Sequence, residues 1–363
     1  MEVRLGEQLE FRSGSCSPPR RARGRVPVYG ANGPIGFAAE HNASGPLIVV
    51  GRVGSYCGSV RYCDFDVWVT DNAYVCRAND PAETRYWYYA LQTCRLNEHR
   101  AGSGQPLLNQ RTLREVSVHV AQAPERRRIA EVLGALDDKI ANNERVIEAA
   151  EALMVAMVGS VDARVALSGL ARRSTKLVNP ADFDDVVAHF SLPAFDAGAH
   201  ARPVAGASVK SGKFHLSEPC VLFAKLNPRV PRIWNVVRLP PQMALASCEF
   251  VVLSPLGVDT SLLWSALRQP EVSTSLAQLV AGTSGSHQRI GHKDLLDLQV
   301  PDVRRLGAAQ SATITDLGAL CHARRGQCAQ LAALRDALLP GLVTGEVAVS
   351  GGELLLASPL GTP

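Results

Sequence analysis

Two polar stretches of this chain combine glycines with side chains that can form paired hydrogen bonds. They cover residues 102–111 and 282–289. The candidate contact residues are Ser103, Gln105, Asn109 and Arg111 in the first stretch, and Ser286, His287, Gln288 and Arg289 in the second. Arginine can pair with guanine, and asparagine or glutamine with adenine, through two hydrogen bonds in the major groove, while serine and backbone amides hold phosphates. Such loops suit DNA, but they also occur on proteins that bind no nucleic acid.

A basic segment near the N-terminus could hold phosphates in the same way. It places Arg20, Arg21, Arg23 and Arg25 among Gly, Ser and Pro residues. On charge alone, a solvated surface segment explains it equally well. Because the net charge is only +4, any nucleic-acid surface must come from where the charges lie.

The sequence lacks the patterns typical of catalysis. It has no Gly-rich phosphate loop, no nucleophile elbow and no His-Glu-x-x-His pair. His287, His292 and Asp294 could be metal ligands, but their polar neighbours favour a surface loop. The nine cysteines include no Cys-x-x-Cys pair, so we expect reduced, mostly buried thiols. We therefore expect no catalytic residue, metal or cofactor in this chain.

Length and composition predict two or three globular domains, since the chain has 363 residues, of which 46% are hydrophobic. No stretch reaches the roughly 18 apolar residues of a membrane span, and no apolar run follows Met1. We expect a cytoplasmic protein.

A long helix is predicted over residues 124–158, where apolar residues recur at alternating steps of four and three. This spacing keeps one narrow seam facing a partner helix, as in a coiled coil. Asn143 is the polar seam position, which would cost stability but fix the register. The seam positions are Ile129, Leu133, Leu136, Ile140, Asn143, Ile147, Ala150, Met154 and Met157.

A second helix is predicted within residues 302–345, and we expect it to stop at Leu339-Pro340-Gly341. Its seam is weaker, since Arg324 and Arg335 lie in it. The positions that carry it include Ile314, Leu317, Cys321, Cys328, Leu331 and Leu338. The alternative is that each helix is an amphipathic element packed only on its own domain.

The remaining segments predict two mixed α and β domains, over residues 1–123 and 159–301, followed by a tail over 346–363. β-like runs are expected at 26–29, 47–50, 67–70, 74–76, 116–120, 204–209, 220–224, 233–239 and 250–253, and helices at 82–97 and 259–281. Residues 48–53 align with 221–226, which pairs Arg52 with Lys225, and residues 102–106 align with 282–286. Arg52 and Lys225 could each be a phosphate contact or a partly buried cation. The chain is interpreted as a divergent tandem repeat, domain-helix-domain-helix.

Five segments together resemble the specificity subunit of Type I restriction-modification systems. Residues 26–36 and 51–60 are similar to its target-recognition domain, as are residues 282–290. Residues 133–140 and 334–346 resemble its two helices. The order of these segments makes the resemblance specific over nearly the whole chain. The second domain departs from the pattern, because the Tyr-Gly-Ala-Asn-Gly turn of the first has no clear counterpart.

The resemblance implies an α+β fold in which two target-recognition domains each read one half of a split DNA target, while two antiparallel helices set the gap. Its segments add Tyr29, Asn32, Ser55 and Tyr56 to the candidate DNA contacts, and the basic residues Lys210 and Lys213 are further candidates. It also implies two methyltransferase subunits and a motor-nuclease subunit as partners, which would carry S-adenosylmethionine, Mg²⁺ and ATP. Two other hypotheses remain: a coiled-coil scaffold with two protein-binding domains, and a self-contained nuclease or methyltransferase.

Overall fold

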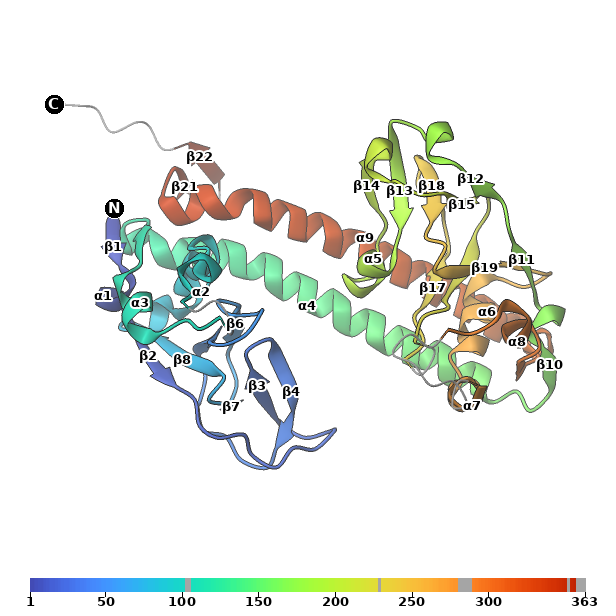
Figure 1. Ribbon diagram of the computed structural model, residues 1–363, viewed down its shortest axis with the longest axis horizontal. Helices are drawn as coiled ribbons and strands as arrows, with labels where there is room; N and C mark the ends of the chain where they lie inside the picture. Colours follow the sequence, from blue (N-terminus) through green and yellow to red (C-terminus); the bar gives the residue numbers. More distant parts are fainter. Residues whose placement is uncertain (102–105, 228–229, 280–288, 351–352, 357–363) are drawn as a thin grey trace. The chain divides into compact units, whose positions relative to one another are not determined.

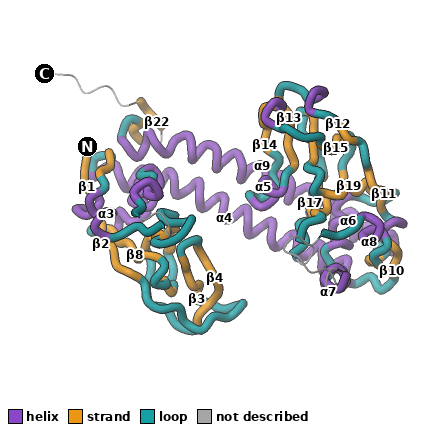
Figure 2. Tube along the Cα trace, in the orientation of Figure 1, coloured by secondary structure: helices purple, strands orange, loops and turns teal. Residues whose placement is uncertain are grey.

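The computed structural model describes residues 1–101, 106–227, 230–279, 289–350 and 353–356. The chain divides into two compact units, which we call unit 1 (Met1–Asp138 with Ala332–Pro363) and unit 2 (Lys139–Leu331). Both units mix helices and sheets, as Figures 1 and 2 show. The predicted α+β fold class is confirmed. The units do not follow the predicted segment boundaries, because each contains part of both long helices.

Unit 1 is built on a four-stranded antiparallel sheet in the order β2-β8-β5-β6. A second sheet has the order β4-β3-β7, and β1 pairs with β9. Helix α2 (Thr84–Thr93) covers one face of the larger sheet with Tyr86, Trp87 and Tyr89, which are fully or almost fully buried. The strands are β1 (Glu2–Arg4), β2 (Leu9–Ser13), β3 (Val26–Gly30), β4 (Gly33–Ala38), β5 (Leu47–Gly51), β6 (Val60–Cys63), β7 (Trp68–Val69), β8 (Ala73–Ala78) and β9 (Ser117–His119). Helices α1 (Leu5–Gln8) and α3 (Gln110–Glu115) pack against each other.

Unit 2 repeats this arrangement with a four-stranded antiparallel sheet in the order β11-β19-β16-β17. A mixed sheet has the order β12-β15-β18-β13-β14, and β10 pairs with β20. The strands are β10 (Arg164–Ala166), β11 (Ala171–Ser174), β12 (Leu177–Val178), β13 (Val186–Phe190), β14 (Arg202–Ala205), β15 (Lys213–Leu216), β16 (Cys220–Ala224), β17 (Ile233–Val236), β18 (Met243–Ala246), β19 (Phe250–Pro255) and β20 (Gln299–Pro301). The short helices are α5 (Leu192–Asp196), α6 (Thr260–Leu267), α7 (Pro270–Leu279) and α8 (His292–Leu296).

The central strands of the two units are buried on both faces, which explains their continuous apolar sequences. In β5, Ile48 and Val50 enter one core while Leu47 and Val49 enter another. In β16, Val221 and Phe223 enter one core, and the alternate residues Cys220, Leu222 and Ala224 enter a second. Because side chains alternate across a strand, each run supplies two cores at once. The shared strand order and shared burial agree with the tandem repeat inferred from the sequence.

Helix α4 (Ala123–Gly159) and helix α9 (Ala308–Thr344) are the two predicted long helices. Within unit 2 they run antiparallel, because Cys328 and Cys321 donate to the backbone oxygens of Ile140 and Ile147 at 3.8 and 3.9 Å. From one contact to the next, the α4 residue number rises by seven and the α9 residue number falls by seven, as expected for an antiparallel coiled-coil pair. Asn143 is buried, and its Nδ2 donates to Gln327 Oε1 at 3.0 Å. The predicted polar seam position lies between the helices.

The predicted end of the second helix at Leu339 is wrong. Helix α9 continues through Pro340 to Thr344. Proline removes one backbone hydrogen bond, but Leu342 and Val343 are fully buried in the core of unit 1, and burial of this size outweighs it. Tyr86 Oη also donates to Val343 O at 2.9 Å. Tertiary packing thus holds a turn that local sequence disfavours.

Two other predicted helices are divided. Residues 82–97 form a 3₁₀ turn, helix α2 and a further 3₁₀ turn, separated at Arg95, which has a left-handed backbone with φ 44°. Residues 259–281 form α6 and α7, with Pro270 starting the second helix. The predicted strands at 204–209 and 233–239 are shorter, ending at Ala205 and Val236. No helix in the described ranges is long and apolar enough to cross a membrane.

Candidate nucleic-acid interface

Three loop segments of unit 1 meet at the end of β5. They are the β3–β4 turn, the loop 52–59 and the segment 106–109. Ser59 Oγ donates to Ala31 O of the turn at 2.6 Å, and Gly54 N donates to Pro106 O at 3.0 Å. A Cβ on Gly51 would lie 2.4 Å from Ala31 O, so the turn can approach only a glycine here. The fold therefore brings together loops that are distant in the sequence.

The predicted contacts Asn32, Ser55 and Tyr56 are exposed on these loops. Tyr56 is 56% exposed, which is unusual for a large aromatic residue that only fills a core. An amide, a hydroxyl and an aromatic ring can bond to base edges or phosphates. The sequence reasoning missed Arg61, which is exposed on β6; its Nε would lie 3.7 Å from a Cβ added to Gly33 of the same turn. The signal that could have identified Arg61 from the sequence is its place on the solvent side of a strand.

The basic segment lies along β4. Arg21 N donates to Phe37 O at 2.9 Å, and Phe37 N donates to Arg21 O at 3.0 Å, which fixes this part of the segment to the strand. Its side chains are exposed and, within the described ranges, have no acidic partner within 4.0 Å: Arg20, Arg21, Arg23 and Arg25. Uncompensated guanidinium groups on an exposed strand edge can bind phosphates.

Four predicted contacts have other roles in the structure. Tyr29 is buried, and this burial raises the pKa of its phenol. Lys213 is also buried, with Nζ donating to Ser211 O at 2.9 Å. Asn109 Oδ1 accepts from Thr112 N at 2.8 Å and caps helix α3. Arg52 lies over the Tyr74 ring at 5.7 Å and donates to Asp71 O at 3.2 Å, so it is the partly buried cation of the two alternatives. Tyr29 and Lys213 are therefore withdrawn from the interface.

Unit 2 has a corresponding junction at the end of β16. The β-bridge between Leu226 and Arg289 stands where Val53 bridges Leu107 in unit 1. Arg289 is exposed but pairs with Glu249 at 2.8 Å. Lys225 is half-buried, and the exposed Lys210 donates to Ala207 O at 2.8 Å.

Arg111 of unit 1 is exposed and pairs with Glu115 at 3.1 Å. Surface pairs of this kind are weak and can open toward a stronger anion.

Five predicted contacts lie outside the described residues: Ser103, Gln105, Ser286, His287 and Gln288. Among the residues that are described, no group of three or more His, Cys, Asp or Glu side chains could hold a metal ion. The geometry on both units is that of exposed polar loops beside a rigid sheet, which suits binding of a large polar partner.

Residues 1–152 match the family model described as Type I restriction modification DNA specificity domain. The chain is 26% identical over 139 residues to the Type I restriction enzyme EcoprrI specificity subunit of Escherichia coli, a match covering 37% of this chain and 35% of that protein. The family model covers 152 of the 363 residues, so the first part of the chain is similar to Type I specificity subunits. The match thus spans about a third of that curated relative.

One solved structure of a specificity subunit shares the fold of the chain. The S subunit of a Type I restriction-modification system from M. genitalium superposes with a TM-score of 0.59 at 14% identity, covering 94% of this chain and 96% of that one. An HsdS subunit from Thermoanaerobacter tengcongensis is 15% identical over 95% of this chain and 97% of that one, with a TM-score of 0.30. The first of these supports a fold shared over both halves of the chain.

Proposed function

We propose that the chain is a sequence-specific DNA-binding subunit in which each unit reads one half of a bipartite target. The observation that carries this proposal is the duplicated four-stranded sheet, whose equivalent central strands both end at a polar loop junction. Two equivalent readers on one chain suit a target with two separate halves. The similarity of residues 1–152 to the Type I DNA specificity domain supports the same function.

We further propose that the long helices set the spacer between the halves and dock two methyltransferase subunits, with a motor-nuclease subunit joining for cleavage. In this assembly S-adenosylmethionine, Mg²⁺ and ATP belong to the partner subunits. The continuous 37-residue helices α4 and α9 support a spacing role, because each is longer than packing within one small domain requires.

The electrostatic part of the proposal is tested by DNA binding of the full chain at several salt concentrations. Arg20→Gln combined with Arg21→Gln removes two unpaired cations and should reduce the slope of log affinity against log salt by about 2, since each phosphate contact contributes about 0.9. The matched control is Arg172→Gln with Arg305→Gln, two exposed arginines that already have acidic partners. Equal slopes for both double variants would contradict the assigned phosphate surface.

The half-site assignment is tested by sequencing methylated bases in a strain that carries the chain with its methyltransferase. Asn32→Ala should relax one half of the recognised sequence and leave the other half unchanged, because one lost bidentate contact costs about 1–3 kcal/mol of discrimination. Asn179→Ala is the control, since Asn179 is exposed and its side chain does not cap the turn that follows. Relaxation of both halves by Asn32→Ala would indicate a structural role for this residue.

A further inference from the structure

Unit 2 contains a cavity of about 240 Å³ beside β17 that none of the predicted DNA contacts lines. Phe190 and Trp234 form part of its wall, with ring centroids 4.9 Å apart, and each is 4% exposed. Leu239, Pro240 and Pro241 add further apolar surface. Rigid aromatic and proline side chains give the cavity a preformed shape, as small-molecule sites usually have.

Four basic side chains line this cavity, two of them arginines and two of them histidines. His200 and Arg238 come from loops of unit 2, while His322 and Arg325 come from α9. The described lining contains no Asp or Glu. Among the described residues only Arg325 of these four has an acidic partner, which is Glu151 of α4. An anion in the cavity would therefore meet basic side chains from two sides.

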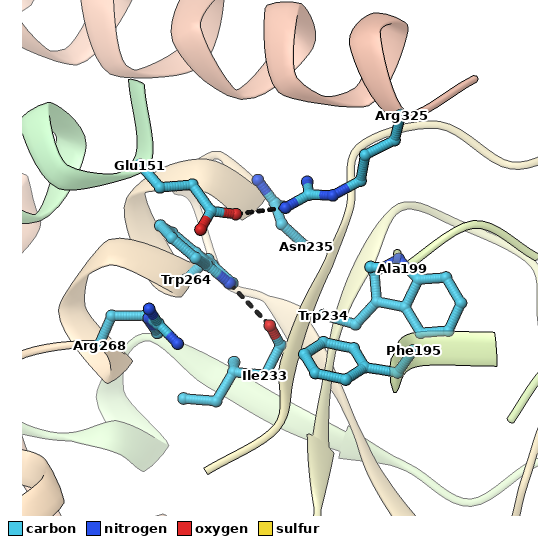
Figure 3. A pocket seen from close by; sticks show the side chains of 9 residues that line it. All are labelled: Glu151, Phe195, Ala199, Ile233, Trp234, Asn235, Trp264, Arg268 and Arg325. Atoms are coloured by element: carbon cyan, nitrogen blue, oxygen red, sulfur yellow. Dashed lines mark hydrogen bonds and ion pairs between the residues drawn. The ribbon is translucent and has the colours of Figure 1, made fainter. Parts of the chain in front are cut away.

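A smaller neighbouring cavity of about 80 Å³ shares four lining residues with the first: Ala199, Trp234, Asn235 and Arg325. Figure 3 shows the polar groups of Glu151, Asn235 and Arg325 gathered on one side of it, with the Phe195 and Trp234 rings on another. The ion pair of Glu151 and Arg325 borders both spaces, since Arg325 lines each of them.

Asn235 lines both cavities, and its side chain is only partly hydrogen-bonded. Its side chain is 8% exposed, and Nδ2 donates to Ser261 Oγ at 3.1 Å. Its Oδ1 has no hydrogen-bond partner within the described structure. Helix α9 approaches this amide closely, since a Cβ on Gly318 would lie 3.2 Å from Nδ2. A buried acceptor without a donor is unfavourable, so Asn235 adds to this wall a polar group that the protein itself does not satisfy.

We propose that this cavity binds a small oxyanion, a carboxylate or a phosphate, carried on an apolar body about the size of one ring. His200, Arg238, His322 and Arg325 hold the anion, and the Phe190 and Trp234 wall contacts the ring. The site is separate from the predicted DNA-reading loops, so this proposal does not depend on the proposed function. Arg325 leaves Glu151 in part when the anion binds, which links the site to the helix pair.

The pH dependence of binding follows from the two histidines. Partial burial, together with Arg238, His200 and Arg325, lowers the pKa of His322, and burial with Arg202 lowers the pKa of His200. Glu151 lines the smaller cavity and pairs with Arg325. At neutral pH both imidazoles are mainly uncharged, and an anion favours their protonated forms. Affinity should therefore rise as the pH falls below the ordinary histidine value of about 6.5.

The test is a ligand-observed NMR titration of the full chain with 4-hydroxybenzoate and with phenyl phosphate, which distinguishes a carboxylate from a phosphate. Arg238→Gln and His322→Asn alter side chains that line the cavity and should each weaken the better probe about tenfold, as expected for one lost charged hydrogen bond. Arg172→Gln, an exposed arginine elsewhere in unit 2, should have no effect. His322→Asn should also reduce the gain in affinity at low pH.

Three results would overturn the proposal. The first is the absence of saturable binding by either probe at millimolar concentration. The second is equal weakening by Arg238→Gln and by the control Arg172→Gln, which would show only a general charge effect. The third is weakening by the Arg20→Gln and Arg21→Gln double variant instead, which would place the probes on the predicted DNA surface of unit 1.

Discussion

Replacing Arg126 should destabilise unit 1 more than any exposed substitution, because its guanidinium is buried and serves several partners. It is 4% exposed and pairs with Glu83 at 2.9 Å. It also donates to Ala121 O at 3.1 Å and lies over the Tyr86 and Trp87 rings at 5.6 and 5.1 Å. These contacts attach the first turn of α4 to helix α2 and to the 3₁₀ turn before it.

The expected size follows from what Arg126→Met would leave behind. Glu83, which is 8% exposed, would keep only the Trp87 Nε1 donor at 3.2 Å. Removing one partner of a buried ion pair typically costs about 3–5 kcal/mol, so we expect a loss of about 4 kcal/mol in the free energy of unfolding. Adding Glu83→Gln removes the lone charge while an amide oxygen can still accept from Trp87. The double variant should then lose only about 2 kcal/mol, mainly from the unpaired Ala121 carbonyl.

The measurement is urea unfolding of the full chain followed by circular dichroism, with hydrogen exchange to show where protection is lost. Loss of protection should concentrate in residues 84–93 and 123–138 of unit 1, while the cores of unit 2 keep theirs. Arg127→Met is the matched control, since Arg127 is exposed and its pair with Asp80 is a surface pair. A double variant as unstable as Arg126→Met would refute the reasoning, because the cost would then come from lost packing rather than from the stranded carboxylate.

Three further predictions concern the helix pair, and a fourth concerns a surface ion pair. Deleting 140–146 together with 321–327 removes one heptad from each helix and places Ile147 opposite Cys328, so the pair should still fold. The helices shorten by about 10 Å, which is about three base pairs at 3.4 Å per pair. Methylome sequencing should therefore show a spacer shortened by about three base pairs, or lost methylation. Deleting 140–146 alone should destabilise the fold in thermal unfolding, because α9 also packs in the unit 1 core through Leu342 and Val343 and would be left seven residues too long. Asn143→Leu should raise the free energy of unfolding by about 1 kcal/mol in urea titrations, since the unpaired Oδ1 is removed and Gln327 keeps its bond to Arg324. A lower free energy of unfolding would show instead that the amide is needed for packing. The Arg85 guanidinium lowers the pKa of Asp138, so Asp138→Asn should reduce stability at neutral pH. The difference in stability between the wild-type chain and the variant should disappear as the pH falls below 3.8, the ordinary pKa of the carboxyl. A difference that does not change with pH would exclude this charge effect.

The sequence predicted the elements that carry a strong periodic pattern. The two long helices and the apolar strands β5, β16 and β19 have side chains whose burial follows from spacing alone. Strands such as β11 and β12 were not predicted, because their partly exposed polar residues resemble loops. Their position depends on pairing with β19 and β15, which are distant in the sequence.

The predicted DNA contacts were harder to place, because a polar residue can face solvent or stabilise its own loop. Asn32 and Tyr56 are exposed, whereas Asn109 caps a helix that begins at the next residue. The pattern Asn-x-x-Thr before a short helix was the signal for that cap. Lys213 precedes an apolar residue on β15 and is buried beside Ser211, which charge patterning alone could not show.

The difference between the two units can be followed to one aligned position. Gly51 ends β5, and the β3–β4 turn presses its Ala31 carbonyl to within 2.4 Å of where a Cβ would be. The aligned residue in unit 2 is Ala224, which ends β16 and buries its methyl group in a core with Leu222. A side chain at this place is compatible with the fold only when no turn approaches it, and the sequence of unit 2 has no counterpart of the Tyr-Gly-Ala-Asn-Gly turn. Unit 2 thus lacks the turn and has a Cβ at Ala224, and the two differences belong together. We therefore expect the two units to present different loops to their half-sites from the same strand framework.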